Sequence, residues 1–99
     1  MNDLPTPDLW PGMDRSTPTA RAWSAIWHAL DADRWLPLKD VIDAIDFTHP
    51  DVKRQTIDTL IRKARTARLV QRRGGYSHKT KRDTREIRRH PATQETAAS

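Results

Sequence analysis

Residues 54–76 read RQTIDTLIRKARTARLVQRRGGY, and this stretch decides the fold. Its first half carries an apolar stripe at spacings of three and four residues, made of Ile57, Leu60, Ile61 and Ala64. That spacing is typical of a helix with one buried face. The pattern then changes to an alternation of two at Val70, Arg72 and Tyr76, which favours a strand. The sequence therefore predicts a helix that runs directly into a strand.

A returning strand is expected after this one. Gly74 and Gly75 favour a bulge in the first strand, because glycine adopts backbone angles that other residues avoid. Residues 77–83 are predicted to form a polar, flexible loop, and residues 84–89 a second strand with Ile87 as its inward residue. The segment therefore reads as a β-hairpin rather than as a basic tail.

The chain upstream carries two more helical patterns. Residues 18–31 follow a Thr17–Pro18 start, which suits an N-cap and a first turn, and their apolar stripe is Trp23, Ile26, Trp27 and Leu30. Residues 37–45 repeat the spacing after an extended Trp35–Leu36, and Pro37 is able to open this helix. We expect three helices to share one small core.

The helix that leads into the strand is predicted over residues 50–67. Thr48 and Asp51 are spaced as a capping box, and Pro50 is tolerated in a first turn. The face opposite the apolar stripe is rich in side chains that bind base edges and phosphates: Lys53, Arg54, Gln55, Asp58, Thr59 and Arg62. Arginine and lysine also occur on any exposed helix, so this face alone does not decide the function.

Charge divides the chain into two parts. Residues 1–51 hold four Lys and Arg against nine acidic residues, whereas residues 52–90 hold fourteen Lys and Arg against three acidic residues. Such an asymmetry favours a face that meets a polyanion, most often nucleic acid, over a plain solvated surface. The acidic outer side of the second helix, with Asp40, Asp43 and Asp46, is expected to turn away from that partner.

The composition also excludes several classes of protein. There is no cysteine, which rules out a disulfide scaffold, a zinc ribbon and a thiol nucleophile. The four histidines are scattered and no glycine-rich phosphate loop is present, so we expect no enzyme, no metal and no cofactor. No apolar run is long enough to cross a bilayer. A cytoplasmic protein is expected, associated with the nucleoid when bound to DNA.

The two ends differ from the middle. Residues 1–16 contain three prolines and read as a flexible arm, residues 17–90 as the folded domain, and residues 91–99 as a disordered tail. Trp10 is the large apolar anchor of the arm. We expect it to fold back onto the domain, with docking of a protein partner as the alternative.

The order of helix, extended WLP, short helix, turn, long helix and basic hairpin over residues 18–90 resembles a winged helix-turn-helix domain. Residues 54–76 resemble the recognition helix and first wing strand of that family. The resemblance implies a mainly α fold with a small hairpin (α+β) and a small transcriptional regulator that reads duplex DNA with helix 50–67 in the major groove. Its wing would carry Arg72, Arg73, His78, Lys79, Lys81, Arg82 and Arg85 towards the DNA.

This sequence departs from the family at the end of the long helix. The family commonly has glycine before the LV pair, where this chain has Arg68, so we expect the helix to close in another way. Two other functions stay open on the same fold: a protein-binding adaptor or inhibitor, including a phage-encoded one, and an RNA-binding protein. Whether the chain forms a homodimer is also open.

Overall fold

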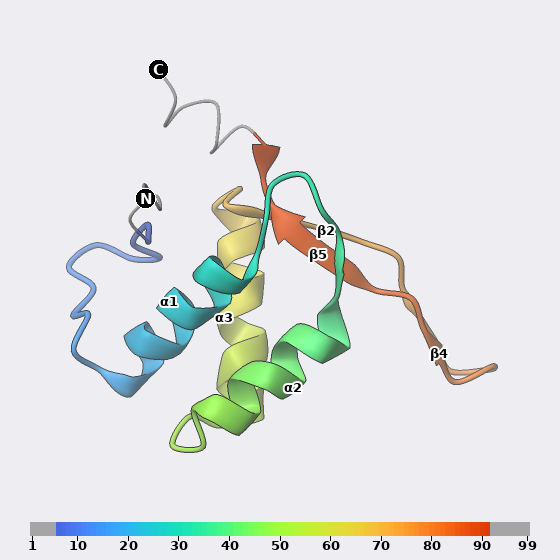
Figure 1. Cartoon of the computed structure of the whole chain (residues 1–99), viewed down its shortest axis with the longest axis horizontal. Helices are drawn as coiled ribbons and strands as arrows, with labels where there is room; N and C mark the ends of the chain where they lie inside the picture. Colours follow the sequence, from blue (N-terminus) through green and yellow to red (C-terminus); the bar gives the residue numbers. More distant parts are fainter. Residues whose placement is uncertain (1–5, 92–99) are drawn as a thin grey trace.

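The computed structural model describes residues 6–91 (Figure 1). Its elements are α1 Pro18–Ala29, β1 Leu36–Pro37, α2 Leu38–Thr48, α3 Arg54–Thr66, β2 Val70–Arg73, β3 Tyr76–Ser77, β4 Arg82–Asp83 and β5 Glu86–Arg89. Three helices and a small antiparallel sheet confirm the α+β class. Residues 1–5 of the predicted arm and residues 92–99 of the predicted tail lie outside the described residues.

Helix α1 supplies the largest side chains of the core. It begins as predicted, because the Thr17 hydroxyl accepts a hydrogen bond from the Ala20 amide at 3.2 Å. Trp23 and Trp27 are both buried, with ring centroids 5.9 Å apart. The helix ends at Ala29, earlier than the predicted residue 31, because the backbone of Leu30 adopts an extended conformation.

Helix α2 is longer than the predicted 37–45. The helix begins at Leu38 with Pro37 as its N-cap, and Pro37 is also the last residue of β1, where it pairs with Glu86. At the other end the helix continues to Thr48, whose hydroxyl donates back to the Ala44 carbonyl at 3.0 Å. The buried face of α2 consists of Leu38, Val41, Ile42 and Ile45.

The predicted start of α3 is wrong. The helix begins at Arg54 instead of Pro50, and its N-cap is Lys53, which makes no side-chain capping bond. The capping box does not form, because Thr48 still belongs to α2. Val52 is buried in the intervening turn, and its amide donates to the His49 carbonyl at 3.0 Å. Burial of this apolar residue therefore overrides the local capping signal.

The end of α3 is closed in the way that glycine usually closes a helix. Arg68 has a φ of 61°, and its amide donates to the Arg65 carbonyl at 3.0 Å. The Leu69 amide donates to the Ala64 carbonyl at 2.9 Å. These two bonds make a Schellman motif with arginine in the left-handed position. The expectation of a different closure was wrong.

A three-stranded antiparallel sheet has the order β1-β5-β2. Strand β2 pairs with β5 along its whole length, and β1 joins the opposite edge of β5 by pairing Leu36 with Ile87. Ile87 is fully buried, as predicted. The sequence predicted extended chain before α2 but not this third strand.

The hairpin continues beyond the sheet through β3 and β4, where Tyr76 pairs with Asp83. Two residues on each strand separate this pair from Arg73–Glu86, so the register is unchanged and the predicted bulge is absent here. Gly74 instead interrupts the ladder with a φ of 80°. The predicted loop 77–83 is reduced to a turn over residues 78–81.

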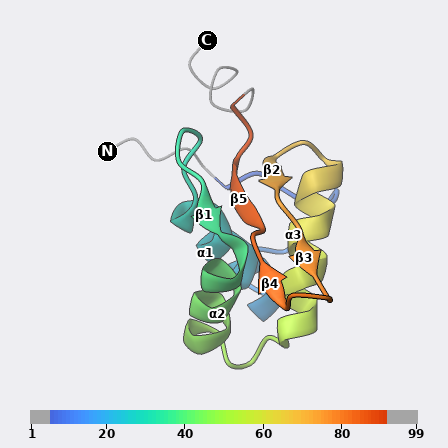
Figure 2. The ribbon, with the colours of Figure 1, turned by 90° about the vertical axis from the view of Figure 1, so that its right-hand side faces the viewer.

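The helices lie on one side of the sheet, and the hairpin projects away from them (Figure 1). Seen along the hairpin, α2 lies below β1 and α3 beside β2 (Figure 2). The described part of the arm packs back onto this core, where Leu9 and Trp10 are partly buried and Met13 is buried. The hairpin is thus the part that extends furthest from the packed body.

Candidate nucleic-acid interface

The polar face of α3 is exposed as the sequence predicts. The apolar stripe of this helix is fully covered by the core. On the opposite side, five of the six predicted residues are exposed and Asp58 is half-buried: Lys53, Arg54, Gln55, Asp58, Thr59 and Arg62. This face is therefore available to a partner.

Two acidic residues of α2 hold the first of these arginines. The Arg54 guanidinium donates to the Asp43 carboxylate and lies 3.5 Å from a carboxylate oxygen of Asp46. The hydrogen bond to Asp43 raises the pKa of Arg54. The acidic side of α2 therefore does not turn away from α3, as was expected, but borders its N-terminal end.

Asp58 is neutralised within its own helix. Its carboxylate lies 3.1 Å from the Arg62 guanidinium, one helical turn further on. Such an exposed pair contributes little to stability. It does remove the repulsion that an unpaired carboxylate on this face would exert on a phosphate.

The base of the hairpin is fixed by Arg85. Its guanidinium donates two hydrogen bonds to the two Asp83 oxygens, both at 2.9 Å, and its amide donates a third at 3.0 Å. These bonds lower the pKa of Asp83 to about 2. Arg85 then lines an open pocket together with residues of two helices, namely Lys39, Ile42, Arg54, Gln55 and Asp58. The hairpin base and the exposed face of α3 thus form one continuous surface.

Arg72 extends this surface. Its cross-strand partner is the buried Ile87, so both side chains lie on the helix-facing side of the sheet. Burial lowers the pKa of Arg72, and so do the nearby positive charges of Arg65 and Arg85. Cations that lie close together create a strongly positive electrostatic potential, and this potential favours the binding of a phosphate.

Arg73 lies on the other face of the sheet. It donates to the Glu86 carboxylate at 2.7 Å, and its guanidinium stacks on the Trp35 ring at 4.3 Å. Arg88 stacks on the same ring at 4.4 Å and donates to Gln71. The predicted wing residues are therefore split between two faces, and Arg73 does not join the surface of α3.

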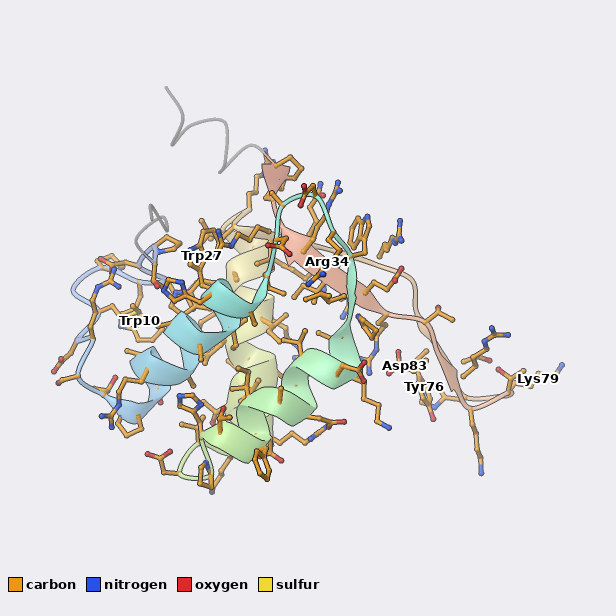
Figure 3. The ribbon with its side chains drawn as sticks, viewed as in Figure 1. Trp10, Trp27, Arg34, Tyr76, Lys79 and Asp83 are labelled. Carbon is orange, nitrogen blue, oxygen red and sulfur yellow. The ribbon has the colours of Figure 1, made fainter. Side chains whose placement is uncertain are left out.

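The remaining predicted residues of the hairpin lie at its tip. His78, Lys79, Lys81 and Arg82 are all exposed. Figure 3 shows Lys79 at the far end of the hairpin, with Tyr76 and Asp83 between it and α2. Among residues 6–91, no acidic side chain forms an ion pair with Lys79, Lys81 or Arg82. These charges are free to meet a polyanion.

Trp10 lies beside the helices (Figure 3), and its neighbour Leu9 lines an open pocket together with Thr59 and Arg62 of α3. The arm around it is tied to α1, because the Trp23 indole donates to the Pro7 carbonyl at 2.7 Å and Thr6 bonds Ser24 at 3.0 Å. Trp10 packs within its own chain as expected, and its role as a docking anchor stays a prediction.

Sequence reasoning missed three residues of this region. Lys39 reaches the pocket from the acidic helix, which gave no reason to include it. Arg65 follows Arg62 at a spacing of three, and that spacing was a usable signal. Trp35, on the other face of the sheet, lies against Arg73 of β2 and Arg88 of β5, and only the pairing of β1 with β5 reveals this contact.

The described residues hold no group of three or more side chains suited to bind a metal. No helix in the described part of the chain has the length and apolar character needed to span a bilayer. No family model, curated protein or solved structure matches this chain.

Proposed function

We propose that this protein is a small regulator that binds duplex DNA with the exposed face of α3 and the helix-facing side of the hairpin. One observation carries the proposal: residues from α2, α3 and the hairpin base line a single open pocket beside the polar face of α3. An exposed helix with a basic hairpin next to it suits a helix in the major groove and a clamp on the neighbouring backbone.

The order of the elements supports the same proposal. A helix, a short strand, two further helices and a two-stranded hairpin, with the first strand at the sheet edge, is the order expected of a winged helix-turn-helix domain. In that arrangement α3 is the recognition helix and the hairpin is the wing. Gln55 and Arg62 are our candidates for reading bases, because both are exposed on α3 and have side chains able to form two hydrogen bonds with one base edge.

The distribution of paired and free cations supports contact with phosphate. Arg54, Arg62 and Arg85 are each held by an acidic neighbour, which fixes their positions. The hairpin tip keeps its cations free. Each phosphate that a cation neutralises releases counterions, so binding should weaken steeply with salt, with a log–log slope of about −5 for about six contacts.

The experiment compares two charge-matched double variants on a duplex selected from a random pool. Arg62→Ala with Arg65→Ala removes two cations from α3, and Arg21→Ala with Arg34→Ala removes two exposed cations elsewhere. We expect the first variant to bind at least about tenfold more weakly at low salt and the second to stay within about twofold. Circular dichroism checks that each variant is folded.

Equal affinities for the two folded variants would refute the proposal. A competition with structured RNA adds a second test. If RNA displaces the duplex at a lower concentration than unlabelled duplex does, the proposal of duplex DNA as the partner is wrong.

A further inference from the structure

The hairpin carries an aromatic pair that phosphate binding does not explain. The Tyr76 and His78 rings meet edge to face, with centroids 4.9 Å apart and planes at 73°. Tyr76 is 46% exposed, and both residues lie beyond the sheet that contacts the helices. Their rings therefore do not serve the core of this domain.

Free cations lie next to this pair along the chain. Lys79 and Lys81 belong to the turn over residues 78–81, and Arg82, which pairs with Ser77, lies on the opposite face of the two-stranded ladder. The phosphates of a duplex would require only these cations. Aromatic rings beside cations are the combination that proteins use to stack the faces of unpaired bases. In a fully paired duplex those faces are already stacked on one another.

The pair is held at a fixed place relative to α3. Tyr76 and its cross-strand partner Asp83 share a face of the hairpin, and Asp83 binds Arg85, which lines the pocket beside α3. Gly75 and Thr84 tie the two strands together, since the Thr84 amide donates to the Gly75 carbonyl at 2.9 Å. Tyr76 consequently faces the same side as the recognition surface.

We propose that the hairpin tip stacks an unpaired DNA base, so that the preferred target is a duplex with a short unpaired segment beside the α3 contact. This inference rests on the proposed function and defines its substrate more narrowly. The tip extends about 17 Å beyond Arg73, since a strand rises about 3.3 Å per residue. The unpaired segment should therefore lie within about five base pairs of the α3 footprint.

The test uses a mixed-sequence duplex and the same duplex with three unpaired nucleotides at its centre or near one end. Both are measured by fluorescence anisotropy, and 2-aminopurine in the unpaired segment reports stacking. Wild-type protein should bind the unpaired duplex at least about fivefold tighter than the paired one and quench the probe.

Substitutions at Tyr76 separate stacking from simple contact. Tyr76→Phe should keep the ratio of the two affinities, whereas Tyr76→Leu and Tyr76→Ala should bring it close to one. Phe47→Ala removes an aromatic side chain on α2 that is 86% exposed, and it should leave the ratio unchanged. The ratio corrects for any general loss of DNA binding.

A ratio of one for the wild-type protein overturns the inference, as does a ratio that Tyr76→Leu retains. Neither result bears on paired-duplex binding, which the Arg62→Ala and Arg65→Ala variant tests separately. The proposed function and the base-stacking role can thus fail independently.

Discussion

At the scale of single residues, Arg68 and Trp27 occupy positions that lower the stability of the folded protein. Arg68 occupies a left-handed position that glycine normally fills. Trp27 is buried with no hydrogen-bond partner for its indole nitrogen among residues 6–91, whereas the indole of Trp23 donates to Pro7. Such positions identify where a single substitution should change stability in a direction that sequence pattern alone does not give.

The first prediction concerns Arg68→Gly. Glycine relieves the strain of the left-handed backbone, although it also makes the unfolded chain more flexible. We expect a net gain of about 0.5–1 kcal/mol in the free energy of unfolding, measured by urea denaturation. Arg68→Ala is the control, because it removes the charge and keeps the strained Cβ. An equal gain from Arg68→Ala would show that the charge of Arg68, and not the strain of its backbone, destabilises the folded protein.

The second prediction concerns the pH dependence of the hairpin base. The folded protein holds the pKa of Asp83 at about 2, below its ordinary 3.8, because Arg85 binds the carboxylate. The contribution of this contact is therefore complete above about pH 4 and is lost as the pH falls to about 2. Carboxyl-carbon NMR should show a midpoint near 2 for Asp83. Arg85→Ala should move it towards 3.8, and an unmoved midpoint would contradict this cause.

At the scale of elements, the hairpin depends on one close approach between the backbones of its two strands, at Gly74 and Thr84. A Cβ at Gly74 would lie 2.2 Å from the Thr84 carbonyl oxygen, and its φ is 80°. Gly75 has open space around the same position. The two neighbouring glycines therefore form a matched pair for an experiment.

We expect Gly74→Ala to lower the free energy of unfolding by about 2 kcal/mol and Gly75→Ala to change it by less than about 0.5 kcal/mol. Thermal and chemical unfolding measure the difference. Hydrogen exchange should also show lost protection at the Thr84 amide in Gly74→Ala. Similar stabilities for the two variants would mean that the backbone around Gly74 and Thr84 can move to accept a side chain at position 74.

The helices and the hairpin could be predicted from sequence because their apolar residues repeat at regular spacing. The start of α3 could not, since Thr48 and Asp51 satisfy a local rule that the burial of Val52 overrides. Strand β1 is only two residues long and ends in proline, so it has no period to detect. The placement of Arg73 was within reach, because the alternation that sets Val70 inward sets Arg73 outward.

The exposure of the polar face of α3 could be predicted from the sequence, but the contacts made by its side chains could not. Arg54 is held by Asp43 and Asp46 from another helix, and no spacing within one helix indicates such a contact. The free cations of the hairpin tip were visible in the sequence, whereas the difference between paired and free cations required the fold.

At the scale of the whole molecule, charge on α2 should affect the affinity of the proposed interface for DNA. Asp43→Asn with Asp46→Asn frees Arg54 and removes two negative charges from the edge of the interface. We expect duplex binding to tighten by about three- to tenfold at low salt, with a smaller gain as salt rises. Asp31→Asn with Asp33→Asn is the charge-matched control. A gain of equal size in the control would indicate a general effect of net charge.

The sheet order β1-β5-β2 also constrains how the protein is made. Its central strand, β5, is the last element of the described chain, and it joins β1 and β2 to one another. During synthesis on the ribosome, the helices and the first two strands emerge before the strand that binds them together. The nascent chain would then hold a partly open core, with Leu36 and Val70 uncovered, until Ile87 leaves the exit tunnel. Folding of this domain is therefore expected to finish only after β5 has emerged.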